Sequence, residues 1–228
     1  MKKTILYINH GDQHEDRVSR ILGDLGFDGV WINPRREMTL PEELDAFCAV
    51  VVYGGEHSVN DNNRQVLAEQ QWINRWVSAS RPYLGLCLGA QFLARALGAE
   101  VKHHPEHLVE TGYIRVEPAI KADDLITHPM HVYHWHNEGF DLPPDCERLA
   151  CSVRYPNQAF RYRPHILGFQ FHPEVTPAIM YHWFNDGGHD LVRRTSTRPE
   201  RQLRDAKRFD PAIENWTQEM LKNWAANF

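Results

Sequence analysis

The stretch with the clearest chemical pattern runs from Tyr83 to Gln91 and reads YLGLCLGAQ. Cys87 lies in its G-x-C-x-G pattern, the cysteine counterpart of the G-x-S-x-G elbow in which a strand turns sharply into a helix. Gly85 and Gly89 let the backbone turn without Cβ clashes, and a helix N-terminus favours the thiolate. The pattern predicts a nucleophile at Cys87; the alternative is a small apolar residue at a strand end.

A thiol nucleophile needs a base, and the base needs a third group that fixes its tautomer. The segment Ile166–Glu174 reads ILGFQFHPE, an apolar run that ends in His172 and continues through Pro173 to Glu174. His172 can be the base, and Glu174 can accept from its other ring nitrogen. Alone, this segment fits better with a polar residue at a strand end and a charge at the start of the next helix. Together with the elbow it favours catalysis, because both segments follow predicted strands, whose carboxyl ends meet at one sheet edge.

Short apolar runs alternate with amphipathic segments over the first hundred residues. Strands are expected at Lys3–Asn9, Gly29–Asn33, Cys48–Tyr53 and Pro82–Leu86. Helices are expected at His14–Leu25, Asn63–Ala79 and Gln91–Leu97, with a helical turn at Pro41–Asp45. This rhythm predicts an α/β fold, an open and mainly parallel sheet with helices on both faces.

From about Val101 the character changes to short runs separated by Pro, Asp and Asn. These runs predict antiparallel strands added to the parallel core, at Tyr113–Glu117, His131–Trp135, Arg148–Arg154, Gln158–Arg161 and Ile166–Phe171. Closing helices are expected at Thr176–Phe184 and Pro211–Trp224. No repeat or long linker divides the chain, so we expect a single domain over residues 1–228, with a C-terminal helical extension from about residue 185.

Composition excludes several functional classes. With 25 Lys and Arg against 30 Asp and Glu, the net charge is −5, so no basic field attracts nucleic acid or an anionic membrane. The apolar run Ile5–Ile8 is shorter than the roughly 7–15 residues of a secretory h-region, and no window approaches the ~20 apolar residues of a membrane span. We expect a cytoplasmic protein in which Cys48, Cys146 and Cys151 are structural thiols.

The two motifs together resemble the class I glutamine amidotransferase family, with its G-x-C-x-G-x-Q elbow followed by its F-H-P-E segment. The likeness extends from the first strand to about Phe184. Within the family, the sequence most resembles the stand-alone members that are similar to the glutaminase domain of GMP synthetase. Further stretches that resemble this group are Ser58–Asp61, Trp135–Pro143 and Asn157–Arg161. The resemblance implies a flavodoxin-like fold and a catalytic triad of Cys87, His172 and Glu174.

Attack by Cys87 on an amide forms an oxyanion, which needs backbone N–H donors. Leu88, directly after the nucleophile, offers one donor. By resemblance to the family's G-G-P loop, Gly55 offers the other and Gly54 lies against the substrate, although Gly54-Gly55 taken alone could be only a turn. Here Glu56 replaces the proline, so the loop loses the fixed φ that proline imposes.

The resemblance also implies two contacts to the ends of the substrate. Gln91 matches the position that helps hold the amino-acid end, whereas the alternative is a surface glutamine. The segment Trp135–Glu138 is similar to a W-H-G-D stretch of the family, and Asn137-Glu138 takes the place of its Gly-Asp, so Glu138 matches the acid. Its carboxylate can bind an ammonium group by a charge-assisted bond, but the additional methylene changes its reach and affects specificity for free glutamine.

Fourteen histidines raise the question of a metal, and four of them, His128, His131, His134 and His136, fall within nine residues. His134 and His136 would share one strand face. A site needs three or four converging ligands, and neither a neighbouring acid or cysteine nor an H-E-x-x-H motif completes one. The sequence therefore predicts hydrogen-bonding histidines, no metal and no organic cofactor.

The expected reaction is hydrolysis of the side-chain amide of glutamine, or of a γ-glutamyl compound, through a Cys87 thioester that releases glutamate and ammonia. In one interpretation the ammonia passes to a separate synthetase subunit, since the chain has no P-loop. In a second, favoured by Glu56 and Asn137-Glu138, the protein is a γ-glutamyl peptidase or hydrolase without a partner. A third, a non-catalytic binding module on the same scaffold, is disfavoured by the intact triad.

Overall fold

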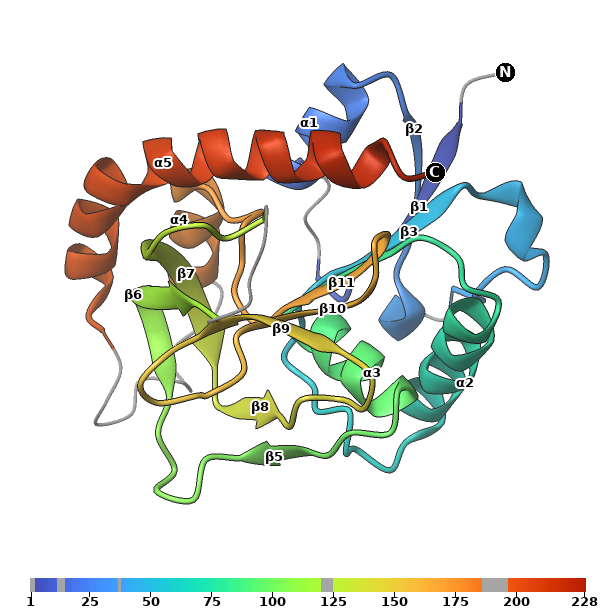
Figure 1. Ribbon diagram of the computed structural model, residues 1–228, viewed down its shortest axis with the longest axis horizontal. Coiled ribbons are helices and arrows are strands. Elements are labelled where there is room, and N and C mark those ends of the chain that lie inside the picture. Colours follow the sequence, from blue (N-terminus) through green and yellow to red (C-terminus); the bar gives the residue numbers. More distant parts are fainter. Residues whose placement is uncertain (1–2, 12–14, 37, 120–124, 186–196) are drawn as a thin grey trace.

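A nine-stranded mixed sheet lies at the centre of the protein, whose computed structural model describes residues 3–11, 15–36, 38–119, 125–185 and 197–228 (Figure 1). From edge to edge its strands are β2 (Asp28–Ile32), β1 (Thr4–Ile8), β3 (Ala49–Val52), β4 (Tyr83–Leu86), β11 (Ile166–Phe169), β10 (Ala159–Arg163), β9 (Glu147–Cys151), β6 (Glu110–Pro118) and β7 (Met130–His136). A separate two-stranded sheet pairs β5 (Val101–His103) with β8 (Glu138–Phe140).

Helices cover both faces of this sheet, as expected for an α/β fold. The helices α1 (Arg17–Asp24) and α5 (Pro199–Ala225) lie on one face, and α2 (Arg64–Ser78) and α3 (Leu88–Ala96) lie on the other (Figure 1). Residues of one strand alternate between the two cores, with Tyr7 facing α1 and Leu6 facing α2. Both faces are buried, which is why the inner strands read as continuous apolar runs.

The parallel part of the sheet includes one strand that the sequence grouped with the antiparallel additions. β11 pairs in parallel with β4, with Phe169 opposite Leu86, and antiparallel with β10. The expectation for Ile166–Phe171 was therefore wrong in direction, although its position as a strand was right. Since β4 and β11 end side by side, the residues that follow them, Cys87 and Gln170, leave the sheet at the same edge.

The C-terminal part of the chain packs into the core through a longer helix than expected. The sequence predicts a helix that starts at Pro211, but α5 starts at Pro199 and contains Pro211. Proline disfavours a helix interior, yet on either side of it Asp210 and Glu214 each lie 2.7 Å from the guanidinium of the buried Arg17. Arg17 thus joins the start of α1 to α5 on both sides of the proline. Residues 186–196, in which the helical extension was expected to begin, lie outside the described residues.

The remaining helical elements are the 3-10 turns η1 (Pro34–Arg36) and η2 (Leu44–Ala46) and the helix α4 (Pro177–Asn185). The helix expected over His14–Leu25 begins at Arg17, because the side chain of Asp16 caps it by accepting from Val18 and Ser19. Within the described part of the chain, every helix is too short or too polar to cross a lipid bilayer.

Candidate active site

Cys87 lies at a strained elbow between β4 and α3. Its φ is 51° and its ψ is −104°, a conformation that residues with a side chain rarely adopt. The neighbouring glycines are required by close approach: a Cβ on Gly85 would lie 2.6 Å from the carbonyl oxygen of Gly89, and one on Gly89 would lie 2.0 Å from that of Val52. The sequence therefore folds this segment as its G-x-C-x-G pattern predicts.

His172 and Glu174 form a short hydrogen bond beside the elbow. Nδ1 of His172 lies 2.6 Å from Oε1 of Glu174, and both side chains are buried. A Cβ on Gly54 would lie 2.7 Å from Cε1 of His172 and 3.4 Å from Cβ of Cys87, so the imidazole and the cysteine border the same small space. The structure thus brings together the three residues that the two sequence motifs singled out.

The electrostatics of His172 favour its charged form. Burial acts to lower the pKa of the imidazole, but the carboxylate of Glu174 and the neighbouring Cys87 outweigh it and raise the pKa to about 10. Nε2, the ring nitrogen not used by Glu174, makes no hydrogen bond of ordinary length among the described residues. In the charged ring Nε2 carries a proton, and it can pass this proton to a neighbouring group or take it back.

Arg17 fixes the chain around Glu174. Its guanidinium donates to the carbonyl oxygens of Pro173 at 2.7 Å and Val175 at 3.0 Å, and its backbone N–H donates to the carbonyl of Glu174 at 3.1 Å. The side chain is only 1% exposed and is neutralised by α5 through Asp210. Sequence reasoning missed Arg17. The signal that could have found it is its position next to Val18, on the side of the first helix that carries the apolar residues.

A chain of side-chain amides leads away from the sulfur. Gln170 Nε2 lies 3.6 Å from Sγ of Cys87, and Gln91 Nε2 donates to Oε1 of Gln170 at 3.2 Å and to the carbonyl of Glu138 at 3.2 Å. Gln91 is 4% exposed, so the alternative of a surface glutamine is wrong. Gln170 was missed, although its place two residues before His172 at a strand end was a usable signal.

The carboxylate of Glu138 lies at the neighbouring edge, on β8. Its Oε1 accepts from Nδ2 of Asn60 at 3.3 Å and lies 3.8 Å from Nε2 of His103. Asn60 belongs to the S-V-N-D stretch, and the same amide nitrogen also donates to the carbonyl of Val101 at 2.9 Å. Asn60 therefore links the loop after β3 to both strands of the small sheet.

A buried histidine and glutamate support the Gly54-Gly55 turn. His10 Nδ1 donates to the carbonyl of Gly54 at 3.1 Å, and His10 Nε2 lies 2.8 Å from Oε1 of Glu69, with both side chains fully buried. Burial lowers the pKa of His10, but the charge and hydrogen bond of Glu69 raise it above its ordinary value. A Cβ on Gly55 would lie 2.8 Å from Cβ of His10 and 3.1 Å from Cδ2 of Leu88, so the turn lies between the two side chains.

Sequence reasoning missed both members of this pair. His10 directly follows the first strand at the carboxyl edge of the sheet, where functional residues gather. Glu69 is a carboxylate on the apolar face of α2, in line with Val66, Ile73 and Trp76. A charged residue inside an apolar stripe is the signal that could have found it, because such a group is buried only with a partner.

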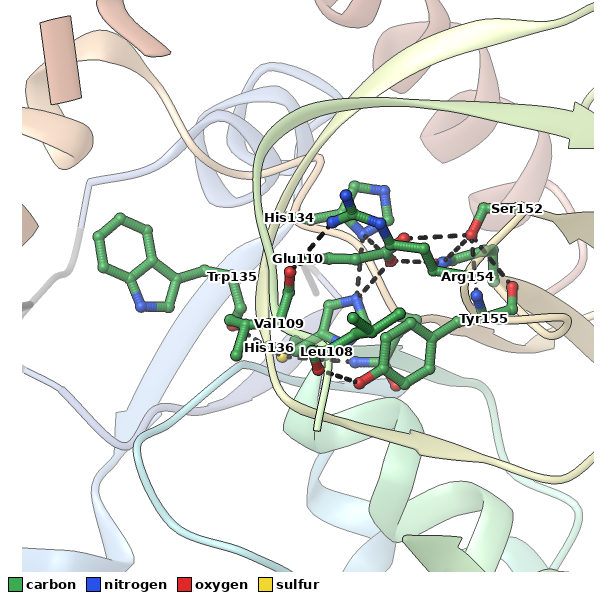
Figure 2. Close-up of polar contacts among 12 residues, drawn as sticks. Leu108, Val109, Glu110, His134, Trp135, His136, Ser152, Arg154 and Tyr155 are labelled. Carbon is green, nitrogen blue, oxygen red and sulfur yellow. Dashed lines mark hydrogen bonds and ion pairs between the residues drawn. The ribbon is translucent and has the colours of Figure 1, made fainter. Parts of the chain in front are cut away.

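A second buried polar cluster lies on β6 and β7. It contains Glu110, an acidic residue that the sequence analysis did not associate with His134 and His136. Glu110 on β6 stands opposite His136 on β7, and His134 lies two residues before it on the same face (Figure 2). Burial lowers the pKa of His134 to about 3, so its ring is neutral. Burial would raise the pKa of Glu110, but hydrogen bonds from His136 and Gln158 help to lower it to about 2.

The other cysteines are free thiols outside this site. Cys48, Cys146 and Cys151 are half-buried and form no disulfide. Burial raises the pKa of Cys48 and raises that of Cys146 to about 12, so these two are poor thiolates at neutral pH.

Comparison with known proteins gives consistent matches. The sequence model of the family described as glutamine amidotransferase class-I matches residues 6–187. The glutamine amidotransferase-like protein YfeJ of Salmonella typhimurium is 35% identical over 161 residues, covering 67% of this chain and 67% of the relative. A glutamine-hydrolyzing GMP synthase subunit of Sulfolobus acidocaldarius is 32% identical over 179 residues, covering 77% of this chain and 90% of the relative.

Solved structures extend the likeness to nearly the whole chain. A glutamine amidotransferase from Thermotoga maritima superposes with a TM-score of 0.88 at 25% identity, covering 98% of each chain. One from Methylobacillus flagellatus superposes with a TM-score of 0.89 at 22% identity, covering 99% of this chain and 94% of that one, which is a likeness of fold.

Proposed function

Because the chain belongs to the class I glutamine amidotransferase family, we propose that it hydrolyses the side-chain amide of glutamine, or of a γ-glutamyl compound, through a thioester on Cys87. The observation that carries the proposal is the placement of Cys87 at a strained elbow beside an imidazole that lies 2.6 Å from a carboxylate. A nucleophile, a base and an orienting group in this arrangement are the requirements of acyl transfer by a thiol.

In the proposed reaction, His172 takes the proton of Cys87 and the thiolate attacks the γ-carbonyl carbon. Because its pKa is raised to about 10, the imidazole holds this proton at neutral pH until the leaving group takes it. The tetrahedral intermediate collapses as His172 gives the proton to the departing ammonia. Water, activated by the now neutral His172, then attacks the thioester carbon and releases glutamate and the thiol. Glu174 keeps the imidazole in one tautomer and orientation throughout.

The oxyanion would be bound by two backbone N–H groups, of Leu88 and Gly55. Leu88 is the first residue of α3, and the first N–H groups of a helix have no intrahelical acceptor. The N–H of Gly55 belongs to the same peptide unit as the carbonyl of Gly54, and the two bonds point in opposite directions across a trans peptide. By donating to that carbonyl, His10 orients the proposed oxyanion donor. This hydrogen bond supplies the rigidity that the loop loses with Glu56 in place of proline.

We assign the amino-acid end of the substrate to Glu138 and Gln91. The carboxylate of Glu138 is 6% exposed and held by Asn60, which leaves its charge to balance an incoming ammonium group. Gln91 connects the Glu138 backbone to Gln170 and thus to the sulfur. Its proposed role is to fix the distance between the nucleophile and the ammonium site.

The proposed acceptor of the ammonia is a separate synthetase subunit. The support is the relationship to a GMP synthase subunit whose name describes it as glutamine-hydrolyzing. A second candidate, a γ-glutamyl peptidase that needs no partner, rests on Glu56 and on Asn137-Glu138, where the chain departs from the family's usual residues. The two differ in whether free glutamine or a γ-glutamyl amide is hydrolysed by the isolated protein.

A glutamine analogue with an electrophilic ketone tests the nucleophile directly. Mass spectrometry of the trapped protein is expected to place one adduct on Cys87, with Cys87→Ala unlabelled and Cys151→Ala labelled as the wild type is. Glutamate release from glutamine and from γ-glutamyl dipeptides is measured in parallel, and Cys87→Ala is expected to lose about 10⁴-fold or more in kcat. An adduct on another cysteine, or undiminished turnover by Cys87→Ala, would refute the proposal.

A further inference from the structure

The polar cluster on β6 and β7 places three ligand atoms within reach of a single ion. Nε2 of His136 lies 3.1 Å from Oε2 of Glu110 and 3.2 Å from Nδ1 of His134, and the latter two atoms are 3.6 Å apart (Figure 2). The side chains are almost completely buried, with residue exposures of 0% for Glu110 and His134 and 4% for His136. They come from two adjacent antiparallel strands, which fix their spacing.

These separations match a tetrahedral metal site. Zn²⁺ binds imidazole nitrogen and carboxylate oxygen at about 2.0–2.2 Å, so the ligand atoms of a tetrahedron lie about 3.3–3.6 Å apart. Of the three observed distances, 3.6 Å lies at the upper end of that range, and 3.1 and 3.2 Å lie 0.1–0.2 Å below it. An ion about 2 Å from all three atoms would lie slightly above their plane, leaving a fourth position for a water molecule.

The hydrogen bonds at the cluster direct lone pairs of neighbouring side chains toward one point. His136 Nδ1 lies 2.8 Å from the carbonyl oxygen of Glu138, which can only accept, so this nitrogen carries a hydrogen. A neutral His136 therefore directs a lone pair from Nε2 toward the carboxylate oxygen of Glu110, which is also an acceptor. Two acceptors at 3.1 Å need a positive charge or a shared hydrogen beside them, which can be a proton on Nε2, the hydrogen of His134 Nδ1 at 3.2 Å, or a metal ion.

The position of His134 favours the metal. With a hydrogen in place of the ion, one hydrogen on Nε2 of His136 must serve two acceptors, Oε2 of Glu110 at 3.1 Å and Nδ1 of His134 at 3.2 Å. A metal ion uses a lone pair from all three residues at once.

An outer layer of hydrogen bonds holds the ligands in place. Ser152 Oγ donates to Oε1 of Glu110 at 3.3 Å, and Gln158 Nε2 donates to Oε2 at 2.8 Å. The Glu138 carbonyl sets the ring orientation of His136 in the same way. Metal ligands in proteins are oriented by outer partners of this kind.

We propose that Glu110, His134 and His136 bind one divalent transition-metal ion, of which Zn²⁺ best fits two imidazoles and one carboxylate. The ion joins β6 to β7 beside the nucleophile. The carbonyl of Trp135, between the two histidines, lies 3.9 Å from Sγ of Cys87, and the carbonyl of Glu138 accepts from both His136 and Gln91. The ion is therefore structural and positions the wall of the candidate active site without contacting substrate.

The test uses the full chain without a histidine tag, carrying Cys87→Ala because a thiolate beside an imidazole could itself bind metal. Chelator-treated protein is titrated with Co²⁺, which absorbs strongly in the visible region when tetrahedral. Binding is expected to saturate at one equivalent. Zn²⁺ at 100-fold excess over its Kd is expected to raise the Tm by roughly 5–10 °C.

Two substitutions locate the ion. Glu110→Gln preserves size and removes the anionic ligand, and it is expected to weaken Co²⁺ binding by more than the about 10–100-fold that loss of an outer partner costs. His131→Asn is the matched control on the same strand, since His131 stacks on Phe209 outside the cluster, and it is expected to bind as the Cys87→Ala parent does.

The parent protein alone can overturn the proposal, whether or not Glu110→Gln folds. Absence of both the visible Co²⁺ spectrum and the Tm increase would show that the cluster is held by hydrogen bonds alone and would refute the proposal. A spectrum that Glu110→Gln leaves undiminished would place the ion elsewhere and refute the assignment equally.

Discussion

His10 offers a way to test the oxyanion hole without touching any group that reacts. His10→Phe keeps a ring of similar size against Phe92, whose ring centre is 6.4 Å away, but it removes the 3.1 Å hydrogen bond to the Gly54 carbonyl. Without that bond, the Gly54–Gly55 peptide is free to rotate and its N–H can turn away from the oxyanion. His10→Asn is the matched variant, because its side-chain amide can still donate to the carbonyl but cannot reach Glu69.

The size of the effect follows from what is lost. A hydrogen bond from a charged donor contributes about 1.5–3 kcal/mol, and complete loss of one oxyanion donor costs about 2.7–4 kcal/mol of barrier. His10→Phe is therefore expected to lower kcat by about 10²–10³-fold, whereas His10→Asn is expected to stay within about 10-fold of the wild type. KM for glutamine should change little, since the contact is made only in the transition state.

Glutamate release is measured over a range of glutamine concentrations, together with the thermal unfolding of each variant. Glu69 is left buried without its partner in His10→Phe, which destabilises the fold by about 3–5 kcal/mol, so activity is compared below the unfolding range. Glu69→Gln is the control for loss of the His10–Glu69 ion pair, because it removes the charge of Glu69 but leaves His10 and its hydrogen bond to Gly54 in place. If folded His10→Phe retains kcat within about threefold, or if KM rises while kcat is unchanged, His10 does not orient the oxyanion donor.

Three further outcomes test the geometry of the site. Gly54→Ala should lower kcat by about 10²-fold or more, because its Cβ would lie 2.7 Å from Cε1 of His172 and must displace the base; unchanged steady-state kinetics would contradict this. The pKa of His172 is raised, so the imidazolium persists through neutral pH, and kcat/KM should fall only as pH rises toward about 10. Glu174→Gln should move that alkaline limb to lower pH, and a pH profile in which it does not move would remove Glu174 as the cause. Cys87→Gly should be about 1–3 kcal/mol more stable to denaturant than Cys87→Ala, because glycine relieves the strain at φ 51°; equal stabilities would show that the elbow is unstrained.

The sequence by itself determined the parts of the protein that depend on a few neighbouring residues. The elbow around Cys87 could be predicted because the glycines on either side are needed within the turn itself, where no other residue fits. His172 and Glu174 could be paired because only one residue separates them. The alternation of apolar runs and amphipathic segments likewise predicted the α/β class, since strand and helix periodicities are local properties of the chain.

Only the tertiary structure decided which distant residues meet. The parallel direction of β11 depends on its pairing with β4, and α5 runs through Pro211, on either side of which Asp210 and Glu214 bind Arg17 on another helix. Glu110 faces His136 through the register of β6 and β7, and Glu69 reaches His10 across 59 residues. These contacts are set by strand register and helix packing, which a local pattern does not encode. The sequence therefore showed the histidine pair but not Glu110 beside it, and the Gly54-Gly55 loop but not the His10–Glu69 pair that supports it.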